Sequence, residues 1–146
     1  MTTTDLTDLY QELIIDHSTR PRNLKHILGA KSAEGFNPLC GDRVTVFVRM
    51  RGGVVVDASF QGEGCAISQA SASLMTESIK GKTRADITAL FNAFHDLVTG
   101  VASPGIGQLG KLTAFSGLRK FPMRVKCGTL AWHTLRAAME SMQEGE

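Results

Sequence analysis

The chain of 146 residues is 42% hydrophobic and 21% charged, a composition typical of a folded globular domain and unlike that of a disordered chain. At this length we expect a single domain over residues 1–146. A formal net charge of +2 is too small to indicate a nucleic-acid or membrane-surface partner.

The N-terminus and the hydropathy pattern favour a cytoplasmic protein. Residues 1–5 lack the basic and apolar stretches of a signal peptide. No apolar run approaches the roughly twenty residues that a membrane-spanning helix needs. The three cysteines cannot all pair within the chain, and an odd number in a reducing compartment favours metal binding or reactive thiols over disulfides.

The first half of the chain predicts a helix followed by a small sheet. Apolar residues at helical spacing indicate a helix over 6–17, and residues 23–37 leave room for a short strand. Valines alternate with other residues over 44–49, which predicts a half-buried strand. Residues 51–53 are typical of a hairpin turn, and 54–60 form the returning strand. The face of that strand expected to be buried comprises Val54, Val56, Ala58 and Phe60.

The second half predicts helices. Helical periodicity indicates helices over 66–81 and 84–98, and a glycine-rich stretch predicts a loop over 100–110. A short helix is expected to include 112–115, and the last helix is expected over 127–143. Because the strands precede most of the helices, we predict an α+β fold, with a small antiparallel sheet of about three strands and helices packed on it.

The cysteines stand at predicted element ends. Cys40 and Asp42 precede the first clear strand, Cys65 follows the second strand and precedes a helix, and Cys127 also precedes a predicted helix. A meander can bring these segments to one end of the sheet, where three thiolates and a carboxylate would form a four-coordinate zinc site. On spacing alone, three unrelated buried cysteines remain the alternative.

The expected helix ends and neighbouring cations bear on the reactivity of these thiols. A helix N-terminus lowers a thiol pKa, which we expect for Cys65 and Cys127, and Lys126 and Arg124 would add to the effect. Arg124 is either a hydrogen-bond partner of Asp42 or a surface charge, and both interpretations stay open. The four histidines, at positions 17, 26, 95 and 133, are expected to be surface or helix-packing residues.

Several motifs in the same order resemble one family. Residues 37–42 read NPLCGD, residues 62–73 read GEGCAISQASAS, and residues 121–127 read FPMRVKC. These segments resemble the U-type iron–sulfur assembly proteins, the IscU/NifU N-terminal family. The 62 positions from Cys65 to Cys127, and Lys126 where the scaffold branch has histidine, are similar to its SufU branch. Lys126 is therefore favoured as a functional cation over a surface lysine.

The resemblance implies a function for each candidate residue. SufU-type proteins of the SUF system bind zinc through three cysteines and one aspartate, here Cys40, Asp42, Cys65 and Cys127. They act as sulfurtransferases that take persulfide sulfur from a cysteine desulfurase, a pyridoxal-phosphate enzyme, and pass it to downstream iron–sulfur assembly proteins. Cys40 would leave the zinc when a desulfurase histidine replaces it, and would then become the catalytic sulfur acceptor.

Two other functions remain open under this resemblance. The same ligands suit a scaffold that holds a labile iron–sulfur cluster. The chain is alternatively a non-enzymatic zinc module that only regulates the desulfurase. Lys126 and the long spacing favour the sulfurtransferase over the scaffold. We expect the desulfurase to contact residues 35–43, 62–65 and 119–126, and we expect no membrane or nucleic-acid partner.

Overall fold

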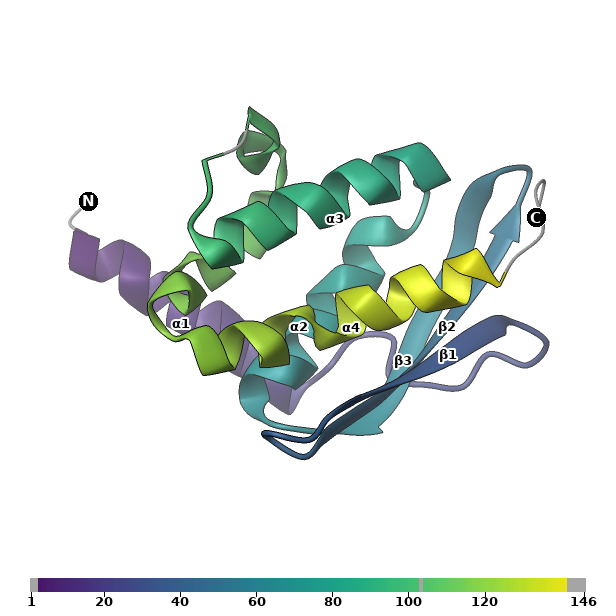
Figure 1. Ribbon diagram of the computed structural model, residues 1–146, viewed down its shortest axis with the longest axis horizontal. Helices are drawn as coiled ribbons and strands as arrows, with labels where there is room; N and C mark the ends of the chain where they lie inside the picture. Colours follow the sequence, from purple (N-terminus) through teal and green to yellow (C-terminus); the bar gives the residue numbers. More distant parts are fainter. Residues whose placement is uncertain (1–2, 103, 142–146) are drawn as a thin grey trace.

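A computed structural model describes residues 3–102 and 104–141 (Figure 1). In chain order the elements are α1 (Thr3–Thr19), β1 (Lys31–Asn37), β2 (Asp42–Arg51), β3 (Val54–Glu63), α2 (Ala66–Ile79), α3 (Arg84–Thr99), the 3₁₀ helices η1 (Pro104–Gln108) and η2 (Gly110–Lys120), and α4 (Pro122–Glu140).

The three strands form an antiparallel sheet in the order β1-β2-β3, which confirms the predicted α+β class. The β2–β3 hairpin turns at Gly52 and Gly53, whose φ angles of 62° and 80° lie in the left-handed region that glycine tolerates best. Helix α4 crosses β1 and β2, α2 packs on β3, and α3 lies beyond α4, so the helices form layers on the sheet (Figure 1).

A β-bulge changes the face that β3 buries. Arg49 pairs with Asp57 and Met50 pairs with Val55, so Val56 is an extra residue on its strand. The predicted inward face is correct for Ala58 and Phe60, which are buried, but wrong for Val56, which is 47% exposed. Because side chains alternate along a strand, one extra residue reverses the pattern, and Val55 is buried in its place.

The helices meet around Trp132, which is fully buried in α4. Its ring stacks on Phe94 of α3, with centroids 4.8 Å apart, and Phe94 meets Phe115 of η2 edge to face. The Trp132 indole N–H donates to Ser71 Oγ, and the Ser71 hydroxyl donates to the Gly128 carbonyl. These contacts attach α4 to α2 next to Cys127.

Helix α4 begins earlier than predicted. Pro122 is its first residue, because proline has no N–H to lose and its φ suits a helix start. The predicted start at residue 127 is therefore wrong, and the predicted end at residue 143 lies outside the described residues. The predicted loop over 100–110 also contains η1. No helix in the described ranges is long and apolar enough to cross a bilayer.

His17 of α1 is buried against α2, which agrees with the helix-packing alternative expected for it. Its Nδ1 is 2.7 Å from Ser73 Oγ, which also accepts the Arg22 N–H, and its Nε2 is 3.7 Å from a Glu77 carboxylate oxygen. A neutral ring that accepts the Ser73 hydroxyl at Nδ1 satisfies all of these groups. Burial lowers the pKa of His17, the Arg22 cation lowers it further, and Glu77 opposes both.

We predict that this histidine makes stability fall in mild acid. Since the pKa of His17 is lower in the folded state than the ordinary 6.5, its contribution is complete above pH 6.5 and is lost as pH falls below it. The slope of the unfolding free energy from this group is at most about 1.4 kcal/mol per pH unit. Denaturant unfolding from pH 7.5 to pH 5 should show a flatter pH dependence in His17→Gln.

The matched control is His95→Gln, which replaces an exposed histidine on α3. This variant should keep the wild-type slope. An unchanged slope in His17→Gln would contradict the assignment of the acid sensitivity to the α1–α2 contact.

Candidate metal centre

The turn between β1 and β2 supplies two of the predicted ligands. Asn37 and Asp42 form the last register pair of the two strands, and the Gly41 N–H donates to the Asn37 carbonyl at 2.8 Å. Gly41 has a φ of 71°, in the left-handed region. The turn exposes the Cys40 side chain. Asp42 is the first residue of β2, and its side chain is fully buried.

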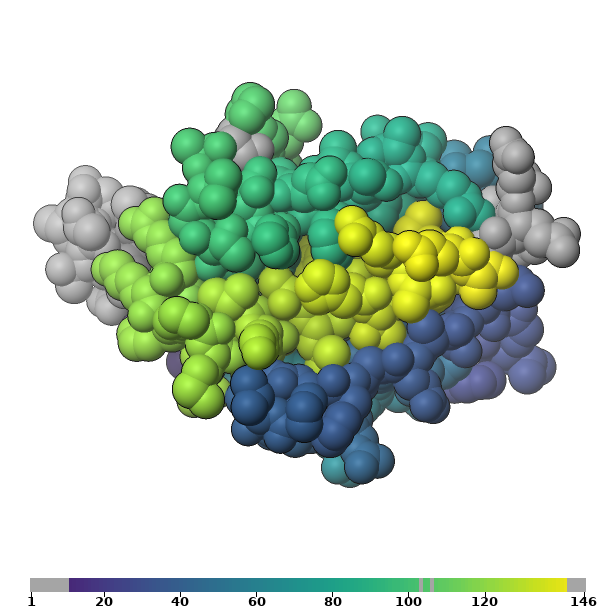
Figure 2. All heavy atoms as spheres, viewed as in Figure 1, coloured from purple at the N-terminus to yellow at the C-terminus, as the bar shows by residue number. Residues whose placement is uncertain are grey.

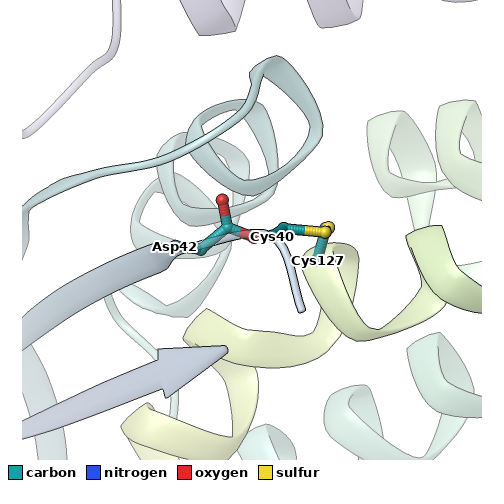
Figure 3. A group of neighbouring side chains, drawn as sticks. All are labelled: Cys40, Asp42 and Cys127. Atoms are coloured by element: carbon teal, nitrogen blue, oxygen red, sulfur yellow. The ribbon is translucent and has the colours of Figure 1, made fainter. Parts of the chain in front are cut away.

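Cys127 reaches this turn from α4. Its side chain is completely buried, and its thiol donates to Cys40 Sγ, with 3.0 Å between the sulfurs. Asn37 Nδ2 donates to the Cys127 sulfur at 3.7 Å. The ligand atoms of Cys40, Asp42 and Cys127 all lie within 4.8 Å of one another, and Figure 3 shows the two sulfurs side by side near the carboxylate. Three of the four predicted ligands therefore converge.

Cys65 borders this group from the start of α2. It is the N-cap residue of that helix, and its backbone N–H donates to Asp42 Oδ1 at 2.9 Å. Its thiol is half-buried and contacts Cys127. The Cys65 sulfur does not belong to the group of three ligand atoms, from Cys40, Asp42 and Cys127, that all lie within 4.8 Å of one another. Gly64 permits the close approach, because a Cβ there would stand 2.7 Å from Asp42 Oδ1. Cys65 therefore lies next to the three converging residues, outside their group.

The Asp42 carboxylate tests whether a metal fits these residues. Its Oδ2 is buried and has no hydrogen-bond partner among the described residues. Burying a polar oxygen without a hydrogen-bond partner costs free energy, and a cation bound to that oxygen offsets this cost. One carboxylate oxygen among thiol sulfurs is a donor set that zinc accepts, and the same thiols suit an iron–sulfur cluster. The residues therefore fit a metal.

Burial raises the pKa of the Cys127 thiol far above its ordinary range, and hydrogen bonds with Cys40, Asp42 and Cys65 raise it further. This corrects our expectation that a helix N-terminus lowers this pKa. Because α4 begins at Pro122, Cys127 lies in the second turn, where the effect of the helix dipole has faded. Metal binding must therefore displace a proton from this thiol.

The two predicted cations lie at the edge of the site. Arg124 and Lys126 occupy the first two turns of α4, and both are exposed. In the part of the chain that the structure describes, neither forms an ion pair, so Arg124 does not bind the Asp42 carboxylate. Both charges remain available to a partner protein.

An apolar rim around the site was not predicted from the sequence. It consists of four large side chains that are more than half exposed: Phe36, Leu39, Phe121 and Met123. The segments that carry them adjoin on the face shown in Figure 2, blue for the first pair and yellow-green for the second. The signal available in the sequence was the FPM tripeptide at 121–123. Apolar residues are usually buried, so an apolar run at a helix start indicates either core packing or an interaction surface.

Sequence analysis also missed Asn37. Its side chain is buried, with Nδ2 on Cys127 and Oδ1 accepting the Leu39 N–H at 3.2 Å. The residue therefore links the turn that carries Cys40 to the helix that carries Cys127. A buried asparagine directly before a proline and close to a cysteine is a pattern that indicates such a structural hydrogen bond.

Comparison with known proteins agrees with this geometry. Residues 9–145 match the NifU-like N terminal domain family. The chain belongs to this family. A relative, the zinc-dependent sulfurtransferase SufU of Bacillus subtilis, is 38% identical over 97% of this chain and 96% of its own. The iron–sulfur cluster assembly scaffold protein IscU of Streptococcus pyogenes serotype M1 is 36% identical over 96% of this chain and 88% of its own.

Solved structures of the family share the fold. The putative iron–sulfur cluster assembly scaffold protein for the SUF system from Fervidobacterium islandicum AW-1 superposes with a TM-score of 0.83 at 38% identity. The superposition covers 88% of this chain and 94% of that one. The small antiparallel sheet with packed helices is therefore the family architecture, as the resemblance to IscU and SufU predicted.

We predict that zinc occupancy depends on Asp42 and Cys65 as well as on the two paired thiols. Asp42→Asn and Cys65→Ser each remove a donor, so zinc affinity should fall by at least about tenfold. Metal analysis after equilibration with a competing chelator measures this loss. Glu63→Gln is the control, since this exposed carboxylate lies close to the site in sequence and should not bind the metal. Full occupancy in Cys65→Ser would remove Cys65 from the ligand set.

Proposed function

We propose that this protein accepts sulfur from a cysteine desulfurase and passes it on for iron–sulfur cluster assembly in the SUF system, with zinc held by Cys40, Asp42, Cys65 and Cys127. The proposal rests on one observation, that the exposed thiol of Cys40 shares a site with the buried donors Asp42 and Cys127. Such a site can hold a metal while one donor remains able to reach a partner.

Cys40 is the proposed sulfur acceptor. It lies on a two-stranded turn and is exposed, so its sulfur can approach a persulfide on another protein. A thiolate attacks the outer sulfur of the donor persulfide, and the donor leaves as a thiolate. Bound zinc would supply the deprotonated state of the thiols at neutral pH.

The other ligands keep the site in place while Cys40 exchanges. Cys127 is buried within a long helix, and the Cys65 N–H orients the Asp42 carboxylate. A carboxylate cannot carry a persulfide, so Asp42 acts on the metal alone. A site with one carboxylate and one exposed thiol exchanges ligands more readily than a closed site of four thiolates.

The main alternative is a scaffold that assembles a labile iron–sulfur cluster. The same donors suit iron, and relatives named as scaffolds are about as similar as the one named as a sulfurtransferase. Lys126, which stands where the scaffold branch has a histidine, favours the sulfurtransferase. A zinc module without enzymatic activity is the third possibility, and sulfur bound covalently to Cys40 distinguishes the first from the third.

The proposed partner is a pyridoxal-phosphate-dependent cysteine desulfurase, and the proposed compartment is the cytoplasm. The apolar rim supports a protein partner at the site, because exposed aromatic and methionine side chains are enriched in interfaces. Arg124 and Lys126 add positive charge beside the rim, and such charges guide an acidic partner into contact.

We predict that Cys40→Ser retains part of its zinc but accepts no sulfur, because a serine hydroxyl stays protonated and cannot attack a persulfide. The measurement is a single turnover of the desulfurase with ³⁵S-cysteine, followed by alkylation and peptide mass analysis. In the wild type, sulfur should first be found on Cys40. Sulfur found first on Cys65, or normal acceptance by Cys40→Ser, would contradict the assignment.

We predict that charge reversal at the rim slows partner association. Arg124→Glu and Lys126→Glu should each reduce desulfurase stimulation at low salt by roughly tenfold, and the effect should shrink as salt rises. Arg51→Glu is the control, since Arg51 is exposed at the opposite end of β2. Unchanged stimulation in both rim variants would place the partner elsewhere.

A further inference from the structure

A second thiol lies within reach of the proposed sulfur acceptor. We propose that Cys127 resolves the persulfide formed on Cys40. In this step Cys127 Sγ bonds to Cys40 Sγ, and the outer sulfur leaves as hydrosulfide. The inference rests on the proposed function, and it assigns to Cys127 a chemical role in addition to metal binding.

The short distance between the two sulfurs is the main evidence for this step. Cys127 Sγ and Cys40 Sγ are 3.0 Å apart, and a disulfide needs about 2.05 Å. A displacement of about 1 Å therefore forms the bond. Cys65 is the third thiol of the chain, and its ligand atom is not in the group that lies within 4.8 Å. The structure thus pairs Cys40 with Cys127.

The two sulfurs differ in mobility, as an acceptor and a resolving thiol must. Cys127 is buried in the second turn of α4, and Asn37 Nδ2 donates to its sulfur. Cys40 is exposed on a turn next to Gly41, where an added Cβ would meet no atom within 4 Å. Cys40 can move outward to meet a donor and return to a fixed partner.

The step balances without an external oxidant or reductant. The bond between Cys40 Sγ and the outer sulfur breaks, and its electron pair leaves with the outer sulfur as hydrosulfide. A new bond joins Cys40 Sγ to Cys127 Sγ, so the Cys127 sulfur is oxidised from thiolate to disulfide, Cys40 Sγ stays at the disulfide level, and the outer sulfur is reduced to sulfide. A dithiol reductant is needed only afterwards, to restore the two thiols.

Bound zinc would keep the Cys127 thiol deprotonated, so its attack on Cys40 Sγ releases no proton, and the hydrosulfide exchanges its proton with water.

Attack at the outer sulfur would have a different result. It would move the sulfur onto Cys127, whose side chain is fully buried, and a recipient protein could not reach it there. Attack at Cys40 Sγ instead releases a small diffusible product. A persulfide that finds no recipient is thereby discharged, and the disulfide marks the discharged state until it is reduced.

The test follows a persulfide after it has formed. Zinc-loaded protein is charged with sulfur in two ways, by a desulfurase with cysteine and by inorganic polysulfide, and the sulfur source is then removed. Free sulfide is measured over time, and alkylated peptides are analysed by mass spectrometry without reduction. We expect sulfide release together with an equal amount of Cys40–Cys127 disulfide.

Variants at two positions separate the resolving role from metal binding. Cys65→Ser removes a proposed ligand but keeps the thiol pair, so it should still form the disulfide. Cys127→Ser and Cys127→Ala should retain the Cys40 persulfide and release sulfide at least about tenfold more slowly, because the adjacent thiol is gone. Circular dichroism checks that each variant is folded, and the second substitution serves if the first is not.

Three outcomes would overturn the inference. They are a stable Cys40 persulfide in the wild type, sulfur transferred to Cys127, and equal sulfide release in the Cys127 variants. If polysulfide charges Cys40 and the disulfide forms, but the desulfurase delivers no sulfur, the proposed function fails while the resolving role of Cys127 stands.

Discussion

The close contact of α4 with the sheet is the constraint on which the site depends. Gly35 of β1 faces Thr134 and Leu130 of α4, and a Cβ at that position would collide with the Thr134 side chain. Gly128 has the same effect on the other side of the helix, where a Cβ would stand 2.6 Å from a Leu118 methyl carbon. A side chain at either glycine would force the Thr134 or Leu118 side chain to shift, so the two glycines permit the close approach of α4.

This packing positions Cys127 beneath the β1–β2 turn. The helix crosses β1 and β2 and is attached to α2 through Ser71, so the Cys127 sulfur is fixed relative to the strand ends. Asn37 then connects the turn to that sulfur. The site is therefore built on the contact between a helix and a sheet, and the turn exposes Cys40.

The division between buried and exposed donors explains how one site can both hold a metal and react. Asp42 and Cys127 are fully buried, where the loss of a donor would leave polar atoms without partners, so they are suited to retaining a metal. Cys40 is exposed beside the apolar rim, where a partner protein can reach it. This arrangement supports the proposed acceptance of sulfur by Cys40 and its proposed later release.

The class of fold, most of the elements and the family could be predicted from the amino-acid sequence. Periodicity depends only on neighbours along the chain, so the α+β class and the helices over 66–81 and 84–98 could be predicted with errors of one or two residues at their ends. The motifs around Cys40, Cys65 and Cys127 were sufficient to identify the family because they occur in the same order over nearly the whole chain.

The environment of each candidate residue depends on packing between elements that are distant in the sequence. The bulge at Val56 arises from pairing between strands, and periodicity along one strand cannot show it. The start of α4 at Pro122 placed Cys127 inside the helix, so burial rather than the helix dipole sets its pKa. The 3.0 Å approach of Cys127 to Cys40 joins residues 87 positions apart, and packing of α4 on the sheet alone creates it.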